Sequence, residues 1–355
     1  MEKLDKNNNY NDNKNNNINY NNYGDNNSTL SKGIIETPSK VILFGEHGVV
    51  DGYGAISMAI NLKTTGRILE NNKNKITINL KDIGKEINLN IEDIPKINPN
   101  NCESDLKYVI GSLRSIMNYL INNKNINSFK PFKLDISSEI PISCGLGSSA
   151  SVIITTIRSF LHANNISLSN KELLKIAFSV EREVQGRASI TDTATIIHGG
   201  ILRIKDNNNF EELNNTELYN LLKKCDFLIV HVEKRRKKTA QLVNEVAKHP
   251  KKVEIFKEIG NIVNKVQYAS SYEELGNLMV KNHNLLKKLG VSTNKIDKVV
   301  EIGSNYGYGA KLSGAGGGGI AIILVDKNKK KELLESLNKL GVLGIFNCKI
   351  EYTGA

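Results

Sequence analysis

The stretch Pro141–Val152, "PISCGLGSSASV", has the composition of a loop that binds phosphate. Gly145 and Gly147 allow the backbone to approach a ligand closely and to adopt unusual dihedral angles. The residues that follow predict a helix over 148–163, whose N-terminal amides and partial positive charge favour an anion. A Walker loop carries a lysine just before its hydroxyl residue, and this loop has none. If the loop holds phosphate, the cation must come from elsewhere in the chain.

The same letters allow two other interpretations. "GLGSSA" fits the dinucleotide-binding pattern G-x-G-x-x-A, which requires a strand directly before it and an acidic residue about 20 positions on, at the end of the next strand. Here Pro141 interrupts the strand early, and the next acidic residue, Glu172, falls within a predicted helix. A dinucleotide site is therefore disfavoured, and a plain tight turn between strand and helix remains an alternative.

A second segment, residues 38–60, places polar side chains in very apolar surroundings. It reads "PSKVILFGEHGVVDGYGAISMAI" and contains Lys40, Glu46 and His47. A lysine at the mouth of a buried strand must find an anion or lose its charge. A surface lysine at the start of a strand, and a histidine that merely fills the core, remain the alternatives.

A third segment, "KLSGAGGGGIAIIL" at residues 311–324, has glycine at five of the six positions from Gly314 to Gly319. Glycine at this density costs conformational entropy, so something must require it. Apolar strands flank the run, which argues against a flexible linker. Close approach of the backbone to a ligand or to another loop is the natural reason.

Composition excludes several classes of protein. The 355 residues carry a net charge of +11, contain no tryptophan and are only 6% aromatic, which disfavours a base-stacking nucleic-acid surface. The lysines are spread along the predicted helices, except for the run 234–238. Such a run can form a localisation or nucleic-acid patch. Its place at a helix entrance also suits an anionic small molecule. The four cysteines form no C-x-x-C pair. Without a signal peptide or an apolar run of about 18 residues, we expect a cytoplasmic protein that does not bind membranes.

The chain divides into three parts. Residues 1–29 are rich in asparagine and predict a disordered tail. An N-terminal domain is expected over 30–206 and a C-terminal domain over 207–355. Strands and helices are mixed without regular alternation, which predicts an α+β fold. Strands are expected at 40–44, 54–60, 66–70, 75–80, 86–91, 132–141, 199–205, 226–232, 309–314, 320–325 and 344–350, and helices at 106–121, 148–163, 171–185, 239–248, 251–268, 272–289, 294–303 and 328–340.

Together these three segments, in this order, resemble the superfamily of galactokinase, homoserine kinase, mevalonate kinase and phosphomevalonate kinase (GHMP kinases). Pro141–Ala150 matches its ATP-phosphate motif, P-x-x-x-G-L-G-S-S-A. "KVILFGEHGVVDG" and "KLSGAGGGG" are most similar to the mevalonate kinase family. The resemblance covers nearly the whole chain after residue 33. It implies a two-lobed α+β fold, with a ribosomal protein S5 domain 2-like N-terminal lobe and a ferredoxin-like C-terminal lobe.

The resemblance also implies roles for individual residues. It adds a fourth segment, residues 179–200, in which Glu181 stands eleven positions before Asp192. By this resemblance Asp192 is the catalytic base, Lys40 reaches the acceptor hydroxyl and the γ-phosphate, and Mg²⁺ is held by Ser149 and Glu181. The ATP phosphates would be bound by Pro141, Gly145, Leu146, Gly147, Ser148, Ser149 and Ala150, and the acceptor by Lys40, Glu46, His47, Asp192, Thr239, Gly314, Ala315 and Gly316.

The activity so implied is ATP-dependent phosphorylation of the primary hydroxyl of mevalonate, a step in isoprenoid and sterol precursor biosynthesis, by a homodimer. Another kinase of the superfamily, acting on phosphomevalonate or a sugar, and an inactive metabolite sensor remain alternatives. "ASITDT", residues 188–193, is more similar to archaeal-type members than to the animal form, Asn-Pro-Ser-Gly-Val-Asp. Feedback inhibition by isoprenoids is therefore left open.

Overall fold

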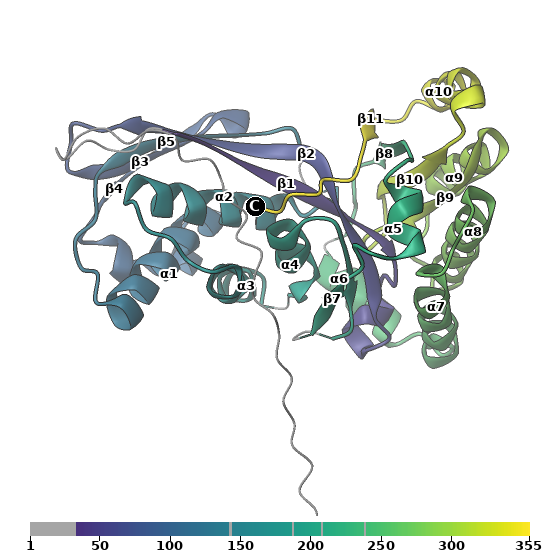
Figure 1. Ribbon diagram of the computed structural model, residues 1–355, viewed down its shortest axis with the longest axis horizontal. Helices are drawn as coiled ribbons and strands as arrows, with labels where there is room; N and C mark the ends of the chain where they lie inside the picture. Colours follow the sequence, from purple (N-terminus) through teal and green to yellow (C-terminus); the bar gives the residue numbers. More distant parts are fainter. Residues whose placement is uncertain (1–32, 142–143, 187, 207–208, 238) are drawn as a thin grey trace, which may run out of the picture.

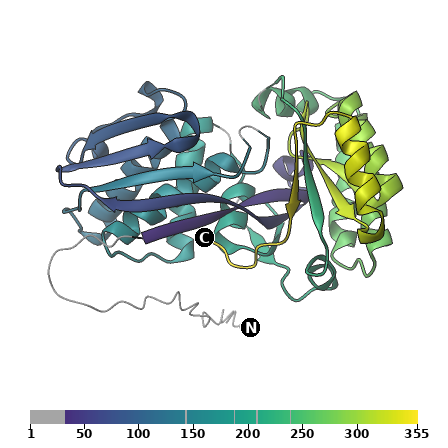
Figure 2. The same cartoon turned by 90° about the horizontal axis from the view of Figure 1, so that it is seen from above.

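The computed structural model describes residues 33–355 except 142–143, 187, 207–208 and 238. The predicted tail, residues 1–29, lies outside these residues. Two lobes lie side by side, and each contains a β-sheet with helices packed against it (Figures 1 and 2). This confirms the α+β prediction.

The first lobe is built on a seven-stranded sheet of order β4-β3-β5-β2-β6-β7, with β1 paired to β2. Only β3 and β5 run parallel; the other neighbours are antiparallel. The strands are β1 (Gly33–Phe44), β2 (Ala55–Glu70), β3 (Lys75–Leu80), β4 (Lys85–Asn90), β5 (Phe132–Ser138), β6 (Ile201–Ile204) and β7 (Phe210–Glu212).

The β1–β2 hairpin is longer than the sequence pattern predicts. The two strands expected at 54–60 and 66–70 form one continuous strand, β2, because the intervening polar residues stay paired with β1 across a register shift. At about 3.3 Å per residue this strand spans roughly 50 Å. It therefore reaches from the first lobe into the second, as Figure 2 shows.

Four helices cover one face of this sheet (Figure 1). They are α1 (Lys107–Lys124), α2 (Ser148–Ala163), α3 (Asn170–Gln185) and α4 (Ile190–His198). Helix α3 begins with a capping box between Ser169 and Glu172. Helix α4 was not predicted, because six of its nine residues are β-branched and have low helix propensity.

The second lobe contains a four-stranded antiparallel sheet of order β11-β8-β10-β9. Its strands are β8 (Phe227–Glu233), β9 (Gly307–Ser313), β10 (Gly319–Val325) and β11 (Gly344–Cys348). This strand order, with helices between β8 and β9 and between β10 and β11, is the ferredoxin-like arrangement that was expected. The helices of this half are α5 (Glu217–Leu222), α6 (Thr239–Ala247), α7 (Lys252–Val266), α8 (Tyr272–Lys288), α9 (Asn294–Tyr306) and α10 (Lys330–Lys339).

One hydrophobic core crosses the junction between the lobes. Ile56 and Met58 of β2 belong to the same buried cluster as Ile229 of β8 and Leu312 of β9. After β11 the chain returns to the first lobe, where the amide of Glu351 donates to the carbonyl of Ala59 at 2.9 Å. The domain boundary near residue 206 stays a prediction, and β7, just beyond it, still pairs with β6.

Among the residues that the structure describes, no helix combines the length and hydrophobicity needed to cross a bilayer.

Candidate active site

A lysine and an aspartate from distant parts of the chain meet beside the glycine-rich loop. Lys40 follows Pro38 on β1, and Asp192 lies in the first turn of α4, whose N-cap is Ser189. Lys40 Nζ lies 2.9 Å from Asp192 Oδ1 and donates to the carbonyl of Gly145 at 3.1 Å. The lysine is 3% exposed and the aspartate 28%. The carboxylate is thus oriented by a buried cation and remains reachable from outside.

The lysine explains why the loop needs a glycine at position 147. Gly147 is the N-cap of α2 and has a left-handed φ of 75°. A Cβ there would lie 3.2 Å from both Cγ and Cε of Lys40. No side chain caps α2, so its first-turn amides, at Ser148, Ser149 and Ala150, have no side-chain acceptor among the described residues. These amides are suited to bind an anion.

The flanks of the loop differ in exposure. Pro141 is half-buried, whereas Leu146 is buried and its carbonyl accepts the backbone N–H of Lys40 at 3.1 Å. The loop is therefore fixed to β1 by a backbone hydrogen bond as well as by the lysine side chain.

A second cation, Arg235, lies over the loop and was not singled out from the sequence. A Cβ on Gly145 would come within 2.4 Å of its Nη2, and one on Gly314 within 2.9 Å. The guanidinium donates to the carbonyl of Cys144 at 3.4 Å and to Oγ1 of the exposed Thr239 at 3.3 Å. Burial lowers the pKa of Arg235, but a guanidinium stays protonated in proteins. The basic run at 234–238 was the available signal, although its last residue lies outside the described part of the chain.

The glycine run of the second lobe meets the phosphate loop of the first. A Cβ on Gly314 would lie 3.8 Å from Cα of Gly145, and one on Gly316 would lie 2.2 Å from the carbonyl oxygen of Val291. Both glycines have left-handed φ values, 83° and 82°. Close approach of backbone to backbone therefore requires glycine here, which is the reason expected from the sequence.

His47 connects the two lobes at this point. Its Nε2 lies 3.0 Å from the carbonyl oxygen of Ala315, so the neutral ring donates from Nε2. Its φ is 62°, unusual for a residue other than glycine. Burial lowers the pKa of His47, which favours the neutral ring. The other nitrogen, Nδ1, is buried and finds no partner among the described residues, so it is available as an acceptor.

Glu46 lies deeper than an acceptor-binding role requires. It is 1% exposed and forms an ion pair with the fully buried Lys311, while Asn282 donates to its other oxygen at 3.3 Å. The carboxylate is thus fully engaged within the protein, and this geometry favours bracing over contact with an acceptor.

Ser149 and Glu181 suit a divalent cation. Gln185 Nε2 lies 3.3 Å from Ser149 Oγ and 3.3 Å from Glu181 Oε1, so one amide connects the two side chains. Glu181 Oε2 is buried and has no hydrogen-bond partner among the described residues. Burial, and then the charge of Asp192, raise the pKa of Glu181 to about 8. A buried, unsatisfied carboxylate next to a hydroxyl is the kind of oxygen ligand that Mg²⁺ prefers.

No cluster of three or more histidine, cysteine or acidic side chains suited to a metal occurs within the described residues.

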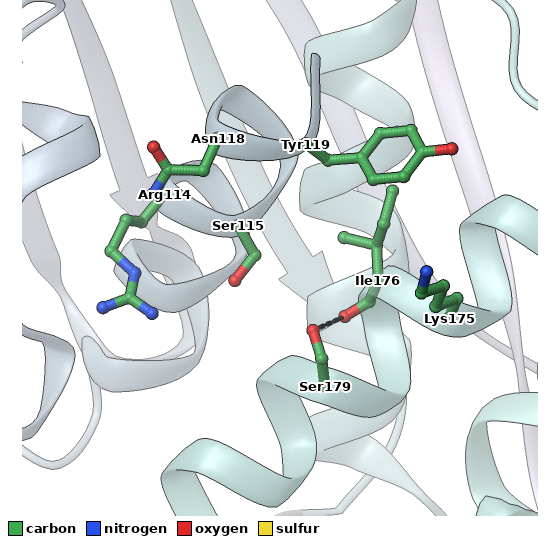
Figure 3. Close-up of a pocket in the computed structure, with 7 residues that line it drawn as sticks. All are labelled: Arg114, Ser115, Asn118, Tyr119, Lys175, Ile176 and Ser179. Atoms are coloured by element: carbon green, nitrogen blue, oxygen red, sulfur yellow. Dashed lines mark hydrogen bonds between the residues drawn. The ribbon is translucent and has the colours of Figure 1, made fainter. Parts of the chain in front are cut away.

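A separate cavity of about 220 Å³ lies between α1 and α3 (Figure 3). It shares no lining residue with the site described above. Ser179 turns its hydroxyl back to the carbonyl of Ile176 at 2.7 Å, so its donor is used internally. The lining consists of Arg114, Ser115, Asn118, Tyr119, Lys175, Ile176 and Ser179.

Two family models match the chain. The model for the N-terminal domain of GHMP kinases matches residues 107–200, and the model for their C-terminal domain matches residues 261–343. The fold and the loop arrangement therefore define a GHMP kinase.

Individual relatives narrow the family. A curated mevalonate kinase of Methanocaldococcus jannaschii is 53% identical over 317 residues, which cover 89% of this chain and 99% of the relative. A mevalonate kinase of Thermococcus onnurineus is 32% identical, with 87% and 93% covered. The crystal structure of the Methanococcus jannaschii mevalonate kinase matches with a TM-score of 0.85 and 53% identity, covering 90% of this chain and 99% of that one. The chain belongs to the mevalonate kinase family.

Proposed function

We propose that this protein transfers the γ-phosphoryl group of ATP to the primary hydroxyl of mevalonate, which gives 5-phosphomevalonate for isoprenoid and sterol precursor synthesis. The observation that carries the proposal is the contact between Lys40 and Asp192, 2.9 Å apart, beside a loop whose amides suit phosphate. The high identity to mevalonate kinases along nearly the whole chain supports the choice of acceptor.

In this proposal Asp192 accepts the proton of the attacking hydroxyl. Its carboxylate is partly exposed and held by Lys40, whose ammonium also reaches the carbonyl of Gly145 in the phosphate loop. A cation at this position lowers the pKa of a hydroxyl that approaches Asp192. General-base help of this kind contributes about 10²–10⁴ in rate.

The remaining positive charge comes from backbone and side chain together. The first-turn amides of α2 and the Arg235 guanidinium lie on the loop, where they can neutralise the triphosphate as charge shifts during transfer. Ser149 and Glu181 would hold Mg²⁺, which supplies charge compensation at the phosphate oxygens when it is bound.

The acceptor is expected between the lobes. His47 offers Nδ1, which has no hydrogen-bond partner among the residues that the structure describes, and Thr239 is exposed beside Arg235. Gly314, Ala315 and Gly316 would allow the acceptor's carboxylate to approach the backbone closely. Glu46 supports this arrangement from behind through Lys311.

A coupled assay for ADP release tests the proposal, with mevalonate, phosphomevalonate, galactose and homoserine as acceptors at equal concentration. We expect turnover with mevalonate and only background with the others. Preference for another acceptor would move the protein to a different kinase of the superfamily. Binding of ATP without turnover on any acceptor would make it a metabolite sensor.

The protein's surroundings are part of the same proposal. We propose that it acts in the cytoplasm as a homodimer that binds neither nucleic acid nor membranes. Light scattering of the purified protein checks the oligomeric state, since a mass near 39.4 kDa would identify a monomer.

A further inference from the structure

Lys311 is a charged side chain sealed inside the protein, outside the proposed site. It lies on β9, is 0% exposed, and is among the largest fully buried side chains of the described residues. Its ammonium contacts the Glu46 carboxylate and donates to the carbonyl of Leu312 at 2.6 Å. The charge also lies 6.0 Å from the centre of the Phe44 ring. None of the proposed chemical steps uses this lysine.

Stability alone does not explain such a pair. Burial lowers the pKa of Lys311 and raises that of Glu46, and each partner's charge opposes the shift of the other. A buried ion pair can often be replaced by apolar side chains without loss of stability, because desolvation offsets the attraction. The buried pair therefore points to a geometric role.

The geometry indicates what that role is. Glu46 and His47 follow the end of β1, and elements of the second lobe hold both of them. Lys311 of β9 and Asn282 of α8 contact Glu46, while the carbonyl of Ala315 accepts from His47. A further bond between the lobes, from Ser313 Oγ to the carbonyl of Ile42 at 2.8 Å, lies beside these contacts.

His47 needs such support. Its left-handed backbone, with φ at 62°, is unfavourable for a side chain of its size, and its side chain makes no cap hydrogen bond. Of the two residues next to His47 in the chain, Glu46 is the one held by an ion pair, which it forms with Lys311. Movement of Glu46 would release the peptide that sets the direction of the imidazole.

We propose that Lys311 is a positioning residue for phosphoryl transfer: it anchors Glu46, and thereby holds His47 against Ala315 so that the two lobes present their loops in one arrangement. This inference rests on the proposed function for its kinetic consequence, but not for its structural one.

The structural test uses the full chain labelled with ¹⁵N-histidine. In the wild type we expect His47 to give an Nε2–H imidazole signal, because the Ala315 carbonyl fixes that tautomer. The signal is assigned to His47 by its loss in His47→Gln. Lys311→Met should shift or broaden this signal. Lys85→Met, which removes the two exposed ion pairs that this β4 residue makes with Glu103 and Asp105, is the matched control and should leave the signal unchanged. An unaltered His47 signal in folded Lys311→Met overturns the proposal, and this readout needs no acceptor.

The kinetic test separates positioning from simple stability. For Lys311→Met we expect kcat/KM for mevalonate to fall about tenfold to 100-fold, as small displacements near reacting groups do. The double variant Glu46→Gln with Lys311→Met removes both charges, so its melting temperature should recover relative to Lys311→Met while kcat/KM stays low. Recovery of kcat/KM to within about twofold of wild type would mean that the pair only fills space, and overturns the proposal.

Circular dichroism establishes whether each variant is folded. If Lys311→Met does not fold, Lys311→Arg keeps the charge with a different shape, and the same two criteria then decide. Inactivity of the wild-type protein with mevalonate would reject the proposed function, and the His47 signal would still decide the role of Lys311.

Discussion

Two buried lysines on opposite sides of the lobe junction make the same kinds of contact, and yet we propose different roles for them. Lys40 and Lys311 are 3% and 0% exposed, and each pairs with a carboxylate and donates to a backbone carbonyl. The partners differ: Asp192 is 28% exposed and Glu46 only 1%. The two pairs therefore differ in access to the carboxylate. Asp192 can accept a proton from a substrate, whereas Glu46 can only maintain the local structure.

The largest effect should come from the open pair. Asp192→Asn keeps the volume of the side chain and removes the base, so kcat should fall by at least about 10²–10⁴. Binding of a non-hydrolysable ATP analogue should persist, because the loop amides are untouched. Stopped-time assays and calorimetry measure the two quantities. Turnover of Asp192→Asn close to the wild-type value would show that the exposed pair has no more part in catalysis than the buried one.

A smaller effect should follow from disturbing Lys40 without replacing it. In Gly147→Ala the new methyl group would press on the lysine, and its left-handed backbone would cost about 1–2 kcal/mol of stability. We expect turnover to fall about tenfold or more as the ammonium moves away from Asp192.

Gly84→Ala is the matched control for this change. Gly84, between β3 and β4, has a similar left-handed φ of 64° and nothing within 4 Å of an added Cβ. It should lose comparable stability in urea denaturation and keep full turnover. Equal losses of activity in the two variants would mean that strain, and not the position of Lys40, controls the rate.

The smallest effect concerns pH. Burial lowers the pKa of His47, His231 and His283 from 6.5. The unfolded chain then binds protons before the folded one as pH falls, so the stabilising contribution is present above pH 6.5 and is lost below it. The free energy of unfolding can be measured by denaturant titration at several pH values below 6.5. For His47→Gln it should change with pH less steeply than for the wild type, by the equivalent of about one proton. An unchanged slope would mean that the ring between the lobes is not sealed from water.

Local sequence signals predicted much of this structure. The helix expected over 148–163 is observed as α2 with the same bounds, because a glycine N-cap and a continuous apolar pattern mark it. Helix α4 escaped prediction because burial of its β-branched residues outweighs their low helix propensity. The helix that carries Asp192 is therefore stabilised by tertiary packing.

Residues of the proposed site could be predicted only where they belong to sequence motifs of the family. Lys40, Ser149, Glu181 and Asp192 belong to recognisable segments, and the structure brings them to one loop. Arg235 stood within a basic run that gave no indication of which side chain turns inward. Lys311 reads as an ordinary strand residue, since nothing local to it reveals that Glu46, 265 positions away, lies opposite.

The segment after β11, at the C-terminal end of the described residues, packs against the first lobe. The amide of Ala355 donates to the carbonyl of Ile196 at 2.9 Å, within the helix that carries Asp192. A Cβ on Gly354 would lie 1.9 Å from the carbonyl of Ile197. A polypeptide that ends near residue 206 would thus keep both Lys40 and Asp192. It would lose the C-terminal segment that contacts the helix carrying Asp192. The first lobe expressed alone should therefore hold Asp192 less firmly than the full chain does.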